Sequence, residues 1–214
     1  MVTNSREVHG PVAAEHVMAL IFALAKKIPR AARLLQKHSW GQEVIWNEGP
    51  RRREIAGSTL GLTGVGSIGR RVAHMASAVG MCVIAVREQV ESGRLRGVRA
   101  VFAPSGLDEM LKQSDFVVLA ASLMAATHGL INADRLAVMK PGACLIHVGR
   151  AAQLDEAALV EALGARPIAV RRLMCLNASH CRRNSRIRQA LAISSGTVTG
   201  SCCPTIWSIS GYPL

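Results

Sequence analysis

Three glycines with the spacing GxGxxG have the clearest chemical role in this sequence. Gly64 stands near the end of an apolar stretch, "STLGLTGV", Gly66 follows it, and Gly69 lies at the start of a helical pattern, "SIGRRVAHMASAVG". A strand that turns into a helix at such glycines points backbone N–H groups and the positive end of the helix dipole at a phosphate. Gly64 permits the tight turn, Gly66 lets a pyrophosphate approach, and Gly69 lets helix and strand pack closely. The pattern predicts a dinucleotide site; the alternative is a glycine-rich turn without a ligand.

Arg87 is the next candidate for binding. It follows the apolar stretch "MCVIAV", at the position where a dinucleotide-binding turn usually places an acid against the adenosine ribose. An arginine can pair with a ribose 2′-phosphate, whereas an acid would repel that phosphate. This favours NADP over NAD as the cofactor. The alternative, a solvated loop cation, stays open.

The elements that must position these residues alternate between apolar strands and short helices. Further along stand the helix "LDEMLKQS", the strand "DFVVLAA", the helix "NADRLAVMK" with Asn132 as its cap, the strand "ACLIHVG" and the helix "LDEAALVEALG". Such alternation predicts a parallel sheet covered by helices on both faces. The expected fold class is therefore α/β, a doubly wound parallel sheet of the Rossmann type.

A long helical pattern precedes this domain. The stretch "GPVAAEHVMALIFALAKKIPRAARLLQKHSW" predicts a helix with Pro11 in its first turn and a break near Lys26, Lys27 and Pro29. Its first half is apolar almost all round, so we expect it to be buried in a domain or subunit contact. A polar, arginine-rich connector, "GPRRREIAGS", follows.

The charge of the chain is unevenly distributed. The 214 residues include 26 Lys and Arg against 14 Asp and Glu, a net charge of +12. Six of the arginines and no acid lie from Ala169 onward, and Glu161 is the last acid in the chain. The rest of the chain is therefore close to ordinary in charge. With 3% aromatic residues and no recognisable module, we expect no specific nucleic-acid partner.

Cysteines and apolar runs exclude two further classes. No CxxC occurs, and the adjacent Cys202 and Cys203 make a poor chelate, so no metal site is expected. The longest apolar run, "VMALIFALA", is too short to span a bilayer, and charged residues interrupt the N-terminus. We expect a cytoplasmic protein without a membrane partner.

Three stretches together resemble the D-isomer-specific 2-hydroxyacid dehydrogenases. They are "VAAEHVMALIFALAKKIPRA", "LTGVGSIGRRVA" and "SDFVVLAASLMAATHGLINADRLAVMKPGACLIHVGRAAQLDEAALVEAL". The resemblance runs from about Val12 to Ile168. It implies an NAD(P)-binding domain, a small 2-oxo or 2-hydroxy acid as substrate, and a homodimer formed through the N-terminal crossing helix.

The resemblance also implies roles for single residues. Ser67 and Ile68 would contact the pyrophosphate. Further cofactor contacts are implied for Ala121, Val148 and Gly149. Arg150 would be catalytic: its guanidinium would bind the substrate carboxylate and polarise the neighbouring carbonyl.

Several positions depart from the family pattern. His147, Val148, Gly149 and Ala151 stand around Arg150 where the family usually has Asn, a small residue, Ala and Gly, and Ser122 replaces a proline of the nicotinamide pocket. His147 is interpreted as a partly buried polar residue, not as a catalytic base.

After Ile168 the sequence no longer resembles that of the family. When permitted codons are read one nucleotide earlier, Val170 to Asn177 can spell Gly-Ala-Ala-Leu-Asp-Val-Phe-Glu, which resembles the family's missing strand. We therefore expect residues 1–168 to form the NAD(P)-binding domain and residues 169–214 to be a frameshifted, poorly ordered tail. Because Arg171 and Arg172 would bury unpaired charge in a sheet, this tail should detach or dock irregularly.

The expected function follows from these parts. A complete enzyme would transfer hydride between a nicotinamide and a small 2-oxo acid, with Arg150 on the substrate and a His–Glu pair supplying the proton. The family's His–Glu pair and substrate domain are not readable in this sequence, so weak or no turnover is expected. The alternative is a non-catalytic dinucleotide-binding or dimerisation module.

Overall fold

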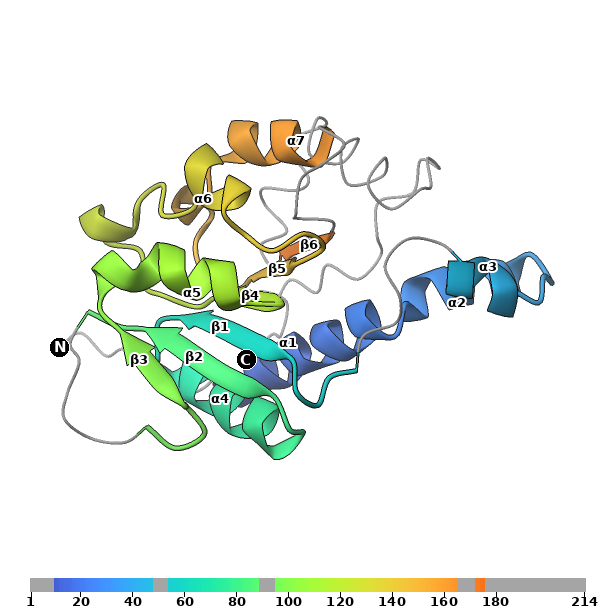
Figure 1. Ribbon diagram of the computed structural model, residues 1–214, viewed down its shortest axis with the longest axis horizontal. Coiled ribbons are helices and arrows are strands. Elements are labelled where there is room, and N and C mark those ends of the chain that lie inside the picture. Colours follow the sequence, from blue (N-terminus) through green and yellow to red (C-terminus); the bar gives the residue numbers. More distant parts are fainter. Residues whose placement is uncertain (1–9, 48–53, 89–94, 165–171, 176–214) are drawn as a thin grey trace, which may run out of the picture.

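A parallel sheet forms the centre of the protein (Figure 1). The computed structural model describes residues 10–47, 54–88, 95–164 and 172–175. Six strands lie in the order β3-β2-β1-β4-β5-β6, and all neighbouring pairs are parallel. They are β1 (Thr59–Thr63), β2 (Cys82–Val86), β3 (Ala100–Phe102), β4 (Phe116–Leu119), β5 (Cys144–His147) and β6 (Arg172–Cys175). This is the order of the doubly wound dinucleotide-binding fold, so the predicted fold class is confirmed.

Helices cover both faces of the sheet (Figure 1). They are α1 (Gly10–Ala25), α2 (Ile28–Gln36), α3 (Gln42–Asn47), α4 (Ser67–Ala78), α5 (Leu107–Gln113), α6 (Ala133–Ala137) and α7 (Glu156–Gly164). Three short 3₁₀ turns, η1 (Pro104–Gly106), η2 (Ala125–Thr127) and η3 (Ala151–Gln153), stand in the connections. The predicted cap of α6 is confirmed, because the side-chain oxygen of Asn132 accepts a hydrogen bond from Arg135 N at 3.0 Å.

The alternation of side chains along each strand divides the core into two layers. In β4, Phe116 and Val118 pack in the layer that contains α1 and α4, whereas Val117 and Leu119 pack in the layer of α5, α6 and α7. All four side chains are fully buried. This is the arrangement that continuous apolar strands require when helices cover both faces.

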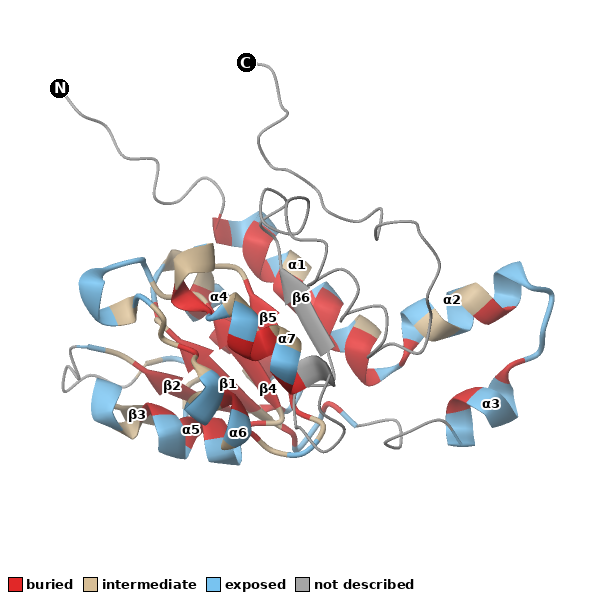
Figure 2. Cartoon of the chain, turned by 90° about the horizontal axis from the view of Figure 1, so that it is seen from above, coloured by how far each residue is buried: buried red, intermediate tan, exposed pale blue. Residues whose placement is uncertain are grey.

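The N-terminal helical pattern is broken where the sequence predicted. Helix α1 ends at Ala25, Lys27 adopts a left-handed conformation with φ of 55°, and Pro29 stands in the first turn of α2. Lys27 is nevertheless buried, and its Nζ donates to the carbonyl of Ile45 at 2.8 Å, which ties α3 to this junction. Helices α2 and α3 extend away from the sheet and are mostly exposed (Figures 1 and 2). Helix α3 was not predicted.

Two strands differ from the sequence-based expectation. Strand β3 is three residues long and half-buried, too short to give an apolar pattern. Strand β6 corrects the expectation that the segment after Ile168 detaches or docks irregularly, because residues 172–175 pair in register with β5. The ladder of a parallel pair joins backbone groups, so the open edge of β5 can pair with a segment of unfavourable side-chain composition. The rest of the tail, from residue 176 onward, lies outside the described residues.

Candidate functional site

The first glycine of the motif lies where strand order reverses, between β1 and β4. Gly64 follows the last residue of β1 and has φ of 82°, a conformation that favours glycine. Its N–H donates to the carbonyl of Val86 at 3.0 Å, which joins the turn to the end of β2. A Cβ at Gly64 would lie 2.6 Å from the Cα of Ala121, on the loop after β4. Backbone from β1, β2 and β4 therefore packs closely around this residue.

The other two glycines face different surroundings. Gly69 is buried in α4, and a Cβ there would overlap the carbonyl oxygen of Gly64. Gly66 is exposed, and no atom of the described residues lies within 4 Å of the position that its Cβ would take. Gly69 thus allows the helix to pack closely on the strand, and Gly66 leaves space for a ligand. A pyrophosphate site requires both features.

The start of α4 fits an anionic ligand. Gly66 is the N-cap residue and makes no side-chain capping bond, and the first turn contains no acidic residue. Ser67 and Ile68, both half-buried, form the beginning of the helix beside the open space at Gly66. Backbone N–H groups of a helix start, together with its dipole, favour a phosphate here.

Arg87 lies at the same edge of the sheet. It directly follows β2, and its N–H donates to the carbonyl of Phe102 at 3.1 Å. The preceding residue, Val86, accepts the hydrogen bond from Gly64. Arg87 is therefore half-buried at the carboxyl end of β2, next to the residue whose carbonyl binds the glycine turn.

The remaining candidates come from the second half of the fold. The N–H of Ala120 donates to Thr63 at 2.9 Å and that of Val148 donates to Leu119 at 3.0 Å, so both loops leave the sheet at its carboxyl edge. Ala121 continues the first loop, and Gly149 and Arg150 continue the second. Arg150 is exposed. The structure thus brings all the predicted site residues to one edge, where doubly wound sheets bind ligands.

A buried polar pair behind Arg150 was not predicted as a unit. His147 is 2% exposed and Gln153 is fully buried, so His147 is a polar residue of the interior, more completely buried than the partial burial that was expected. The Gln153 Oε1 lies 3.4 Å from His147 Nε2 and accepts a hydrogen bond from Arg150 N at 3.1 Å. A single polar residue between Ala152 and Leu154 gave no signal in the sequence for these contacts of Gln153.

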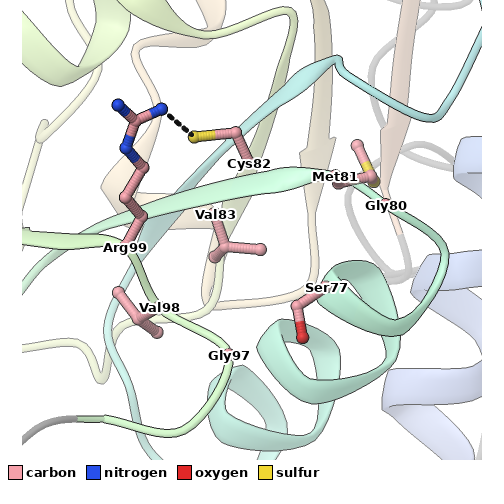
Figure 3. A pocket seen from close by; sticks show the side chains of 8 residues that line it. All are labelled: Ser77, Gly80, Met81, Cys82, Val83, Gly97, Val98 and Arg99. Carbon is pink, nitrogen blue, oxygen red and sulfur yellow. Dashed lines mark hydrogen bonds between the residues drawn. The ribbon is translucent and has the colours of Figure 1, made fainter.

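A hollow of about 420 Å³ lies at the opposite edge of the sheet (Figure 3). It is lined by Ser77, Gly80, Met81, Cys82, Val83, Gly97, Val98 and Arg99, and Arg99 Nη1 donates to Cys82 Sγ at 3.6 Å. Cys82 is the first residue of β2, whereas Arg87 follows its last. None of the predicted site residues lines this hollow, so it is separate from the candidate dinucleotide site.

Three further properties of the described residues concern metal ligands, membrane-spanning helices and a shifted pKa. No group of three His, Cys, Asp or Glu residues within them could hold a metal ion. In the same residues, no helix has the length and apolar character to cross a membrane. Burial lowers the pKa of His16 in α1 below its usual range.

The fold and the carboxyl-edge site together define a dinucleotide-binding α/β domain. Comparison of its sequence with known families gives a more specific result: residues 18–186 match the NAD binding domain of the D-isomer specific 2-hydroxyacid dehydrogenases. The chain belongs to this family. The family membership predicted from the sequence is thereby confirmed.

Known relatives agree with this assignment. Glyoxylate reductase from Pyrococcus furiosus is 33% identical over 166 residues, which cover 76% of this chain and 48% of that protein. A D-lactate dehydrogenase from Aquifex aeolicus, solved with NAD and lactic acid, has a TM-score of 0.71 and 27% identity over 87% of this chain and 57% of its own. A family member from Xanthobacter autotrophicus, solved with NADPH and MES, has a TM-score of 0.69 and 27% identity over 81% and 68% of the two chains. The chain spans about half of the glyoxylate reductase's length.

Proposed function

We propose that this chain is the dinucleotide-binding part of an oxidoreductase that transfers hydride between a nicotinamide cofactor and a small 2-oxo or 2-hydroxy acid. The observation that carries the proposal is the turn from β1 to α4, where Gly66 leaves open space at the point of strand-order reversal. Relatives solved with NAD and with NADPH support a nicotinamide dinucleotide as the cofactor. When bound, this cofactor supplies the hydride acceptor or donor.

The roles of the residues follow from their places at the edge. Backbone N–H groups around Gly66, Ser67 and Ile68 bind the pyrophosphate, and Gly64 and Gly69 shape the turn. Ala121, Val148 and Gly149 line the nicotinamide side, because they belong to the second half of the fold. Arg150 is exposed at the end of β5, where its guanidinium can bind a substrate carboxylate with two parallel hydrogen bonds.

Arg87 supports NADP as the preferred cofactor. Its position at the carboxyl end of β2 is the one from which a side chain reaches the adenosine ribose. A guanidinium there pairs with a 2′-phosphate. We expect the chain to bind NADPH more tightly than NADH, and Arg87→Ala to remove the difference; equal affinities in the wild type would contradict this assignment.

Turnover by this chain is proposed to be weak or absent. No Asp or Glu follows Glu161 in the sequence, so the acid of a His–Glu pair is not supplied by this part of the chain. Titration with NADPH and NADH, followed by assays with glyoxylate and hydroxypyruvate, tests both parts of the proposal. Binding without turnover favours a dinucleotide-binding module; turnover of either acid contradicts the predicted impairment, and absence of binding contradicts the proposed function.

The tail is proposed to arise from a one-nucleotide shift near Ala169, with the NAD(P)-binding domain in residues 1–168. The in-order match of the shifted reading to a family strand supports this, and strand β6 is compatible with it because its ladder consists of backbone bonds. Sequencing the gene around the codon for Ala169 tests the shift. If no one-base change gives an amino-acid sequence that resembles the family, the proposal is wrong.

We further propose a homodimer, formed through the N-terminal helices, in a cytoplasmic location. Large apolar side chains on α2, α3 and the loop between them are strongly exposed in the single chain: Leu35 at 75%, Trp40 at 89% and Trp46 at 62%. Such a surface is typical of a subunit contact. Analytical ultracentrifugation should give a dimer for the wild type and a shift towards monomer for the double variant Leu35→Glu, Trp40→Glu; a monomeric wild type would contradict the proposal.

A further inference from the structure

One buried amide connects the two loops on the nicotinamide side of the site. Gln153 stands at the end of η3, is fully buried, and reaches back to the loops that follow β4 and β5. We propose that Gln153 is a positioning residue: it fixes the loop at Ala121 relative to Arg150 and so sets the width of the nicotinamide side. The inference rests on the proposed function and deepens it.

The two ends of the amide contact different loops. Gln153 Oε1 accepts a hydrogen bond from Arg150 N at 3.1 Å, on the loop after β5. Gln153 Nε2 donates to the carbonyl oxygens of Ala121 at 3.1 Å and Ser122 at 3.3 Å, on the loop after β4. A rotation of the amide by 180° would put its N–H groups against another N–H and its oxygen against two carbonyls. The three bonds therefore fix one orientation of the amide and connect the loops.

His147 and Gly149 are matched to this orientation. His147 Nε2 lies 3.4 Å from Gln153 Oε1, and an amide oxygen accepts, so the tautomer of His147 with its proton on Nε2 is the one that suits this contact. A Cβ at Gly149 would overlap Gln153 Oε1 and lie 3.3 Å from the carbonyl oxygen of Ala121. Glycine at this position therefore provides the room that the amide occupies, and residues 149 and 153 should be energetically coupled.

The connection concerns one half of the cofactor site. In a doubly wound sheet each half binds one nucleotide, and β4, β5 and β6 form the half opposite the glycine turn. The hydrogen bonds of Gln153 end on the loops after β4 and β5, whereas the N–H of Gly64 in the turn donates to the carbonyl of Val86. Loss of the amide should therefore weaken binding of the nicotinamide part and leave binding of the ADP-ribose part intact.

A comparison of ligands on the full 214-residue chain tests this separation. The probes are the reduced cofactor that the wild type binds more tightly, NADH or NADPH, and its fragment without nicotinamide, ADP-ribose or its 2′-phosphate. For Gln153→Leu, calorimetry should give an affinity for the cofactor about tenfold weaker, as expected when two loops lose their hydrogen-bonded connection. The affinity for the fragment should change less than about twofold on the same scale. Gln153→Glu, which keeps the acceptor for Arg150 N but loses the donor to Ala121, should resemble Gln153→Leu.

The outcomes separate the two proposals. If the wild type binds neither cofactor nor fragment, the proposed function fails and the positioning role fails with it. If the wild type binds both and Gln153→Leu weakens both equally, or neither, the positioning role alone is wrong.

A second test needs no ligand. Gly149→Ala should lower the Tm of the chain, and it should lower it less in a Gln153→Leu background, where the amide oxygen that a Cβ would meet is absent. Additive changes in Tm would show that the two positions are not coupled and would overturn the inference.

Discussion

At the carboxyl edge of the sheet, the turn at Gly64 is held by backbone packing and Gly66 faces open space, whereas at the amino edge one residue, Asp115, joins three strands through its side chain and its backbone together. There the carboxylate of Asp115 accepts from Thr59 N at 2.9 Å and from Lys140 Nζ at 3.3 Å. The backbone of Asp115 also binds Thr59 and Cys144, so this residue connects β1, β4 and β5.

The difference separates stability from binding within one sheet. A residue that connects strands by its side chain contributes to folding and is distant from any ligand at the other edge. A glycine with open space above it adds little to folding and leaves room for a ligand. Substitutions at the two edges should therefore affect different measurements, except where a residue of the site is itself tightly packed.

Gly64 is that exception and should show the largest effect. Gly64→Ala places a Cβ on a backbone in the left-handed conformation, 2.6 Å from the Cα of Ala121. Relief of this overlap requires a shift of the end of β1 or of the loop that follows β4. We expect a loss of about 3 kcal/mol in the free energy of unfolding and loss of cofactor binding. Chemical denaturation and cofactor titration measure the two; a variant as stable as the wild type would contradict the described turn.

Asp115 should show a smaller loss that is confined to stability. Asp115→Ala leaves Thr59 N–H and Lys140 without their carboxylate partner, which should cost about 2 kcal/mol. Asp115→Asn keeps an oxygen for Thr59 N–H and should lose less. Cofactor affinity should match the wild type in both variants; a weaker affinity in Asp115→Asn would remove the separation between the edges.

Substitution of Asn132, the cap of α6, tests whether cofactor binding depends on this helix. Asn132→Ala removes the acceptor for Arg135 N and should cost about 1 kcal/mol. Asn132→Ser, which can still cap the helix, should be close to the wild type in Tm. Reduced cofactor affinity of Asn132→Ala in a titration, beyond that of Asn132→Ser, would extend the binding region to α6.

His16 in α1 should give the smallest effect, and one that depends on pH. Burial lowers its pKa in the folded chain, so the unfolded chain binds the proton more readily. The stability that this residue contributes is present above the unfolded pKa near 6.5 and decreases as the pH falls towards the folded value. Between pH 7.5 and 5.5 the wild type should lose more Tm than His16→Gln; parallel curves would contradict this.

Much of the fold could be predicted because its signals are local. The apolar strands, the cap at Asn132 and the break before Pro29 each depend on residues close together in the sequence. Strand β3 could not be predicted, since three half-buried residues give no periodic pattern. Strand β6 could not be predicted either, because it pairs through its backbone at the edge of β5, which its side-chain composition does not report.

The candidate site was predictable in part. Gly64, Gly66 and Gly69 form a motif, and Arg150 was found by resemblance, so their common edge followed from the topology. Gln153 was missed because its role depends on two carbonyl groups more than thirty residues earlier in the chain. No local pattern encodes a contact with backbone oxygen atoms of another loop.

Gly66 gives the most direct test of the central claim, that the open space at this glycine receives a dinucleotide. Its φ is −78°, which a residue with a side chain can adopt, and in the part of the chain that the structure describes nothing lies within 4 Å of its Cβ position. The measurement is the cofactor affinity of Gly66→Val, by calorimetry on the full chain, with Tm recorded for the same sample. We predict a Tm equal to that of the wild type and no detectable binding of NADH or NADPH; wild-type affinity in this variant would contradict the account.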